Sequence, residues 1–242
     1  MATECRKRLA QCRALNRTCD VRGCHMPTQK WGRWCDKHDK INERTGHPRG
    51  HTIRVATVKP LIKPIRNYIR ENRDHPSIQQ ALLWLYELVY GPRSRVQDIH
   101  RKSKPEDRLG RFLDKMKAQN VHEVDMLAII VAMYLMRELY PNDFKTDRHF
   151  RHQIATRLLR MVNAPRKEKW GGGHAIYIYD RITVGVRELL GPHLETNLGL
   201  LCNQIARLHV DVFVPPAPII PELKGSTPHA KSNPTCNRYP QG

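Results

Sequence analysis

Segment 19–38 constrains the fold of this chain more than any other stretch, because it carries four potential metal ligands at short, paired spacings. Cys19 and Cys24 form the first pair, and Cys35 and His38 form the second, in the pattern Cys-x4-Cys-x10-Cys-x2-His. Zinc binds four cysteine or histidine ligands in a tetrahedron, and structural sites commonly take them from two such pairs. Gly23 lets the backbone turn tightly within the first pair. The spacing therefore predicts one structural Zn²⁺ per chain.

The second pair of ligands opens a polar segment that is compatible with a helix. Cys35 and His38 are three residues apart, so in a helix their side chains share one face and can reach one ion. We therefore expect a knuckle to supply Cys19 and Cys24 and the start of a helix to supply the other two ligands.

Three other interpretations of these residues stay open. The cysteines can be separate free thiols of a reduced protein, since such spacing is specific but not unique. His25 adjoins Cys24 and can replace one of the four ligands. Cys5 and Cys12 lie on a basic stretch, and we interpret them as free thiols, although either can contribute a ligand.

The order of elements in this part of the chain resembles a known kind of module. It has the Cys-x4-Cys pair, a small basic loop, Gly-x-x-Cys-x2-His, a polar helix, and then Gly46-His47-Pro48. This order is similar to small treble-clef-like zinc modules of phage-borne DNA-binding proteins, some of which accompany HNH homing endonuclease domains. The resemblance covers about a fifth of the chain and implies zinc and contact with DNA. Residues 60–242 carry no such resemblance.

The charge of the chain points to a polyanionic partner. Lys and Arg number 42 against 23 Asp and Glu, which gives a net charge of +19. Cations that neutralise phosphates release counterions, so this excess favours nucleic acid, and DNA more than RNA. An acidic protein partner is the alternative explanation. Residues 1–60 hold fourteen of the cations against five acids, so the excess is greatest around the predicted zinc site.

Two groups of cations are the candidate nucleic-acid contacts. The first surrounds the zinc site, and the second lies on a predicted helix with few acids. Contacts from such residues go mostly to phosphate and carry no base information. Trp34 lies among the first group, and we favour a place in the small core beside the metal over base stacking. The candidates are Arg13, Arg17, Arg22, Lys30, Arg33, Lys37, Lys40 and Arg49, with Arg148, Arg151 and Arg157 as the second group.

The hydrophobic pattern predicts a mainly α-helical protein with four parts. We expect a basic zinc module at 1–50, a linker at 51–60, a multi-helix bundle at 61–213, and a disordered proline-rich tail at 214–242. The segment 121–139 is apolar on most sides, which predicts a central helix.

Turn and cap signals predict where the bundle helices begin and end. Pro60 and Pro64 should open the first helix, and Ser77 with Gln80 should form a capping box at the second. Thr146 is a candidate cap for a helix that runs to Val162. Gly191-Pro192 should break the last helical segment. Residues 176–179 fit a strand or the start of a helix.

No catalytic motif is recognisable, and we assign no catalytic residue. His149 and His152 lie on a predicted helix, without the asparagine and histidines that an HNH nuclease needs on a ββα unit. We expect a non-enzymatic DNA-binding protein in a phage or mobile-element replication or transcription setting. A zinc-containing nuclease and an adaptor that docks a polymerase or helicase through the bundle are the alternatives. The first twelve residues lack an apolar signal region, and the run Met126–Met136 is too short to span a bilayer. We therefore expect a cytoplasmic or nucleoid location and no membrane partner.

Overall fold

The computed structural model places helices over most of the chain that it describes. The described residues are 18–28, 32–92, 103–162, 166–169, 175–178 and 182–213. They contain seven α-helices, which confirms the predicted mainly α fold class. The helices are α2 (Asp36–Thr45), α3 (Val55–Glu71), α4 (Pro76–Tyr90), α5 (Pro105–Ala118), α6 (Glu123–Leu139), α7 (Asp147–Leu159) and α8 (Val184–Phe213).

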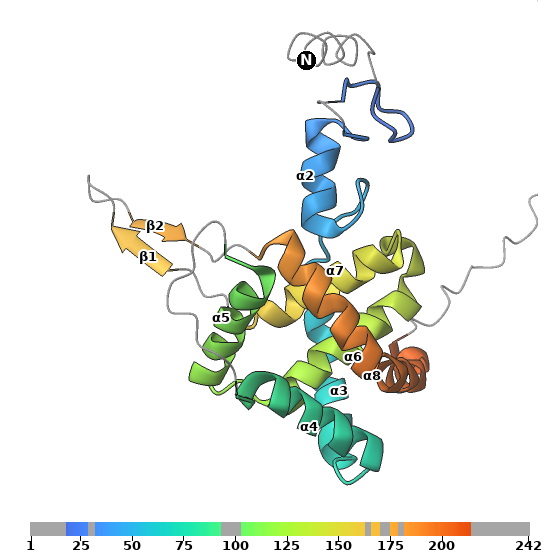
Figure 1. The fold of residues 1–242 in the computed structure, drawn as a ribbon. Coiled ribbons are helices and arrows are strands. Elements are labelled where there is room, and N and C mark those ends of the chain that lie inside the picture. Colours follow the sequence, from blue (N-terminus) through green and yellow to red (C-terminus); the bar gives the residue numbers. More distant parts are fainter. Residues whose placement is uncertain are drawn as a thin grey trace, which may run out of the picture.

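Helix α6 is the centre of the bundle, as its apolar sequence predicts. It packs against α3, α4, α7 and α8 (Figure 1). Residues on every side of it, such as Leu127, Ile130 and Met133, are completely buried. His122 caps its first turn by accepting a hydrogen bond from the Val124 amide at 3.2 Å. The helix ends at Leu139, and a short 3-10 turn, η1 (Pro141–Asp143), follows.

Helix α3 begins earlier than the prolines predict. It starts at Val55, so the predicted linker 51–60 is helical in its second half. Val58 and Leu61 are buried in line with Ile65, which extends the apolar stripe of the helix upstream. Pro60 lies on the exposed side in the second turn, where it removes one amide donor from the helix. Burial of the stripe outweighs this loss.

Helix α8 is continuous through Gly191-Pro192, so the predicted break there is wrong. A Cβ atom on Gly191 would lie 2.9 Å from the Cβ and the carbonyl oxygen of Arg151 on α7. The glycine therefore lets α8 approach α7 closely. The packing of the two helices holds α8 together across Pro192, which removes one amide donor from the helix.

Of the two predicted helix N-caps, the one at α7 is present and the one at α4 is not. Thr146 caps α7, since its hydroxyl accepts a hydrogen bond from the His149 amide at 3.1 Å, which confirms the prediction. Helix α4 instead starts at Pro76, and its cap is His75, whose ring accepts from the Ser77 amide. The Ser77 capping box is therefore wrong by two residues, because Pro76 is itself suited to the first helical position.

Among the described residues, one two-stranded sheet lies beside the bundle (Figure 1). β1 (Arg166–Lys169) pairs antiparallel with β2 (Ala175–Ile178), with Arg166 opposite Ile178. The ambiguous segment 176–179 is therefore a strand over its first three residues. Among the described residues, we find no helix with the length and apolar character that a membrane crossing requires.

Candidate metal centre and the basic surface beside it

A short knuckle brings Cys19 and Cys24 to the same side of the chain. The Cys19 amide donates to the Met26 carbonyl at 3.0 Å, and the Cys24 amide donates to the Val21 carbonyl at 2.9 Å. Gly23 lies in the turn at φ 82°, a left-handed conformation that glycine adopts without steric cost. The turn directs both sulfur atoms toward the start of α2.

Helix α2 supplies the other two ligands from its first turn. Cys35 is the N-cap residue, with extended backbone, and His38 follows three residues later on the same face. Asp20 links the knuckle to this helix, because its amide donates to the Arg33 carbonyl at 3.0 Å and its carboxylate pairs with the Arg33 side chain at 2.9 Å.

The four ligand atoms form one cluster, in which all lie within 4.8 Å of one another. His38 Nδ1 is 3.3 Å from Cys19 Sγ and 3.4 Å from Cys35 Sγ, and Cys24 Sγ is 3.9 Å from Cys35 Sγ. Bond lengths of about 2.3 Å to sulfur and 2.0–2.1 Å to nitrogen put the ligand atoms of tetrahedral zinc about 3.5–3.8 Å apart. The predicted set can therefore hold a metal ion of this size.

The cysteines of the cluster differ in how easily they ionise. Burial opposes ionisation of Cys19, but hydrogen bonds from the Cys35 and Val21 backbone, and from His38 and Cys24, lower its pKa to about 6. For Cys24, a hydrogen bond with the Met26 backbone lowers the pKa. Burial and the neighbouring sulfurs of Cys35 and Cys19 raise it by more, so the pKa of Cys24 lies above its usual value. A divalent cation would relieve this repulsion, because it pairs with several thiolates at once.

The cluster is also the core of its part of the chain. Cys19, Val21 and Cys35 are buried together, with Cys24 and Trp34 packed against them. Trp34 therefore takes the core position that we predicted for it, and the Arg33 guanidinium lies 5.9 Å from its ring centre. We call residues 18–50 the metal module from here on.

The described part of the chain brings neither His25 nor Cys202 into the cluster. His25 is exposed and does not belong to the cluster. Cys202 is completely buried in α8, and burial raises the pKa of its thiol far above the usual range. Cys5 and Cys12 lie outside the described residues, as do the predicted tail at 214–242 and the contact candidates Arg13, Arg17 and Lys30.

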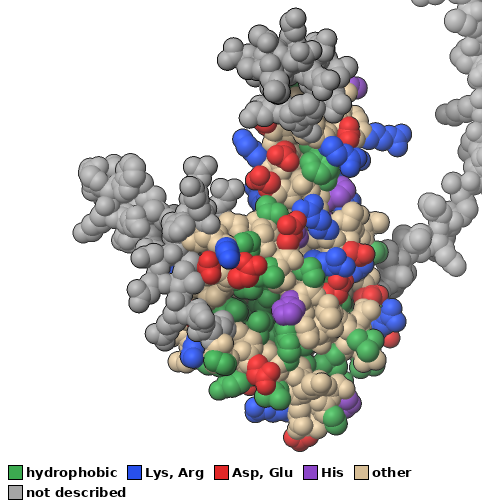
Figure 2. Space-filling view, viewed as in Figure 1, with side chains coloured by type: hydrophobic (Ala, Val, Ile, Leu, Met, Phe, Trp, Pro, Cys, Tyr) green, Lys and Arg blue, Asp and Glu red, His purple; other side chains and the backbone are tan. Residues whose placement is uncertain are grey.

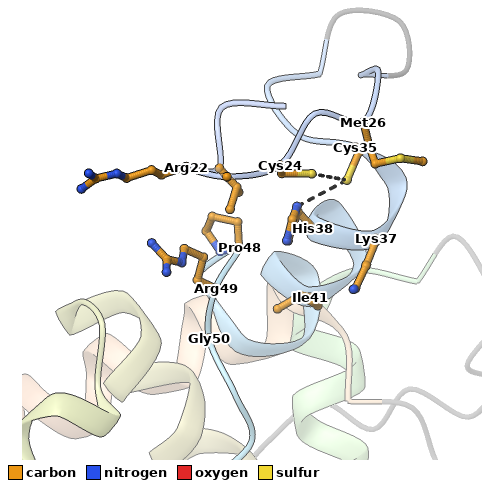
Figure 3. Close-up of a pocket in the computed structure, with 12 residues that line it drawn as sticks. Arg22, Cys24, Met26, Cys35, Lys37, His38, Ile41, Pro48, Arg49 and Gly50 are labelled. Carbon is orange, nitrogen blue, oxygen red and sulfur yellow. Dashed lines mark hydrogen bonds between the residues drawn. The ribbon is translucent and has the colours of Figure 1, made fainter. Parts of the chain in front are cut away.

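An open groove of about 530 Å³ lies at the cluster, and three of the four candidate ligands, Cys24, Cys35 and His38, line it (Figure 3). Arg22 of the knuckle, Lys37 of α2 and Arg49 of the following turn line it. In the figure, Arg22 and Arg49 extend in the same direction, and Lys37 lies on the other side of His38. The apolar lining residues are Val21, Met26, Ile41 and Pro48.

The predicted contacts of the metal module are exposed. Arg22, Lys37, Lys40 and Arg49 reach solvent, and among the described residues the structure shows no ion pair for any of the four side chains. Arg33 differs, because Asp20 holds it. These four cations are therefore available to an external anion.

The second group of predicted contacts is already engaged. Arg148 pairs with Glu188, and Arg151 pairs with Glu195, both of α8. Arg157 is buried, and burial, reinforced by Arg160, lowers its pKa below the usual value. Figure 2 shows the same mixing of cations and acids where α2 meets the bundle. The α7 surface is thus neutralised by another helix rather than within its own helix, and nucleic-acid binding by these three residues stays a prediction.

A polar joint attaches the metal module to the bundle (Figure 1). Arg187 of α8 donates to the Thr156 hydroxyl and to the Glu43 carbonyl near the end of α2, both at 3.0 Å. The Arg148 guanidinium also donates to the side-chain oxygen of Asn42 at 3.4 Å. Sequence reasoning missed Arg187, since one arginine in an apolar helix carries no signal for its partner.

The protein has no recognisable relative in three comparisons. Searches with protein-family models, among curated proteins and among solved structures each found no match. The resemblance to treble-clef and HNH-associated modules therefore has no support from a related protein. What stands is the geometry: four cysteine and histidine side chains that can hold a metal ion, on a mainly α-helical protein.

Proposed function

We propose that the metal module binds one structural zinc ion and that the protein binds nucleic acid, DNA in the first instance. The observation that carries the metal half is the four-ligand cluster, which combines three sulfurs and one imidazole at tetrahedral spacing. Such a ligand set is typical of closed structural zinc sites, which leave no open position for a substrate.

The charge of the module supports the nucleic-acid half of the proposal. Arg22, Lys37 and Arg49 are exposed around the metal, and among the described residues the structure shows no ion pair for these three side chains. Contacts of this kind go to phosphate, so they predict strong dependence on salt and little dependence on base sequence. The zinc would fix the segments that carry these cations relative to one another.

Metal content and DNA binding of one variant pair test this function. Native mass spectrometry should find one zinc ion per chain in the wild type and none in Cys35→Ala. Fluorescence anisotropy with a labelled DNA duplex of mixed sequence should show weaker binding by this variant. Cys202→Ala is the control, because it removes a buried cysteine of the bundle and should keep the zinc.

The two halves of the proposal can fail separately. A wild-type protein without zinc, or a Cys35→Ala variant that retains it, contradicts the metal site. A zinc-loaded protein whose affinity for DNA stays constant between low and high salt contradicts phosphate binding. Cutting of the duplex in the presence of Mg²⁺ would instead support the nuclease alternative.

A further inference from the structure

The groove at the metal cluster is lined by the candidate ligands Cys24, Cys35 and His38 and, apart from these, by charged side chains of one sign. Its charged side chains are Arg22, Lys37 and Arg49, and no Asp or Glu lines it. The three cations come from three separate segments: the knuckle, α2 and the turn after α2. Arg22 and Arg49 extend to one side of His38, and Lys37 lies on its other side (Figure 3). A bound metal ion would offset most of the thiolate charge, so the remaining charges of this concave surface are cations, which concentrate the field on an anion that enters it.

Helix α2 separates its charges between two faces. Asp36, Asp39 and Glu43 follow one another at intervals of three and four residues, so they lie on one face of the helix. Lys37 and Ile41, four residues apart, lie on the face that lines the groove. The acids of α2 are therefore directed away from the groove, and Asp20 of the knuckle is paired with Arg33, so a polyanion meets less repulsion at the groove than on the opposite face of α2.

Between the groove and the bundle, the chain carries His47 and Lys145, and one acid, Asp143, lies nearby with its carboxylate 3.8 Å from the His51 ring. The His47 ring accepts a hydrogen bond from the Arg49 amide at 3.1 Å, and burial, Arg49 and Lys145 together lower the pKa of His47. Lys145 is exposed in the turn before α7, where its ammonium group also donates to the Asn142 carbonyl. Contact between the His149 ring and the His51 carbonyl, at 2.9 Å, holds this turn against the module.

The α7 arginines that the sequence predicts as contacts are less suitable for binding phosphate than Lys145. Glu188 and Glu195 neutralise Arg148 and Arg151, and Arg157 is buried, so a phosphate would have to displace existing partners. Among the described residues, the Lys145 ammonium group donates to the Asn142 carbonyl and pairs with no carboxylate.

We infer that a nucleic-acid phosphate backbone occupies the groove between Arg22, Lys37 and Arg49 and leaves it across His47 toward Lys145. This inference rests on the proposed function and adds the face and the path of the ligand. The inferred path does not include Lys40, which does not line the groove. It also does not include the predicted contacts on α7.

Two matched pairs of lysine variants test the path. Lys37→Ala removes a groove cation, and Lys40→Ala removes an exposed cation from the same helix but outside the groove. Lys145→Ala removes the exit cation, and its control, Lys63→Ala, removes an exposed lysine of α3. Each variant is measured as the full chain with its metal, and zinc content by native mass spectrometry verifies that the module is intact.

The expected result is a contrast within each pair. Loss of one phosphate contact should weaken binding of a labelled mixed-sequence DNA duplex by about threefold to tenfold and reduce the salt slope of log K by about one. Lys37→Ala and Lys145→Ala should show this loss, and Lys40→Ala and Lys63→Ala should change the affinity by less than about twofold.

Other outcomes overturn one proposal or both. If the wild type binds with a clear salt slope but Lys40→Ala weakens binding as much as Lys37→Ala, the groove is not the path and the proposed function survives. If only Lys145→Ala behaves like its control, the exit over His47 is wrong and the groove stands alone. A wild type without salt-dependent binding overturns the proposed function and the path together.

Discussion

The metal module and the helical bundle are held together by different forces. In the bundle, Leu127, Met133 and Phe150 belong to one continuous apolar core that spans every helix from α3 to α8. In the metal module, the buried hydrophobic cluster consists of Cys19, Val21 and Cys35, with Cys24 and Trp34 at its edge. Three of these five residues are also the proposed metal ligands.

This difference shows what each part needs in order to fold. Ordering a residue costs about 1–2 kcal/mol of backbone entropy, and a cluster as small as that of the module buries too little apolar surface to offset this cost. Metal binding supplies the missing free energy in such units. The bundle has the apolar area of an ordinary domain, so its folding should not require the ion.

Removal of the metal should therefore unfold one part and spare the other, which is the largest effect we expect. Structural zinc contributes about 10–16 kcal/mol to the folding of small zinc units. After treatment with a chelator, amide hydrogen exchange should become fast in residues 18–50, and the amides of α6 should stay protected. Readdition of zinc should restore the protection.

Two results would break this comparison. Persistent protection of α2 after complete removal of zinc would show that the joint with α7 and α8 suffices to fold the module. Loss of protection in α6 would show that the bundle depends on the module and that the two parts fold as one unit.

A substitution in the bundle core should have the converse effect. Leu127→Ala leaves a cavity in the centre of α6, at a residue that is completely buried. Such changes cost about 2–5 kcal/mol. The urea midpoint of the bundle should fall, with one zinc ion still bound per chain. Leu200→Ala is the matched control, because Leu200 is 78% exposed and its loss should change stability by less than about 0.5 kcal/mol.

His152 should make the boundary between the two parts sensitive to pH. It is buried on α7, and neither ring nitrogen has a hydrogen-bond partner among the described residues. Its ring also faces Gly46 at the end of α2, on which a Cβ atom would lie 3.0 Å away. Burial, reinforced by Arg148 and Arg187, lowers the pKa of His152 to about 4.

The direction of the effect follows from the pKa of a histidine in the unfolded chain, which is about 6.5. Between these two values the unfolded chain binds more protons, so stability is complete above about pH 6.5 and falls as the pH decreases toward 4. The loss should reach about 2–3 kcal/mol. His152→Gln should remove this part of the pH dependence, and the difference between the two proteins excludes acid effects on the metal ligands. Equal pH profiles would show that His152 does not titrate across the folding transition.

Local patterns in the sequence predicted the parts of the molecule that depend on local geometry. The metal cluster followed from four ligands at fixed spacing, since a knuckle and one helix turn suffice to bring Cys19, Cys24, Cys35 and His38 together. Helix α6 followed from an apolar segment that can be stable only when it is surrounded. In both cases the nearby residues determine the structure almost without reference to the rest of the chain.

Features that depend on distant partners were not predictable. Few acids lie near Arg148 and Arg151 in the sequence, and their partners come from α8, forty or more residues away. The continuity of α8 at Pro192 depends on the close approach of Gly191 to α7. A helix-breaking signal expresses a local preference of a few kcal/mol, and tertiary packing exceeds it here.

The smallest effect we expect concerns the joint itself. Arg187 connects Thr156 with the Glu43 carbonyl, so Arg187→Met keeps an apolar stem and removes both hydrogen bonds. Each bond contributes about 0.5–1.5 kcal/mol. Hydrogen exchange should therefore become faster near residues 42–46, while zinc content and the exchange of α6 stay as in the wild type. Arg207→Met is the control, because Arg207 is exposed on the same helix and lies 3.9 Å from Glu138. If Arg187→Met instead lowers the zinc content, the bundle helps to shape the metal site, and the two parts are less independent than their cores suggest.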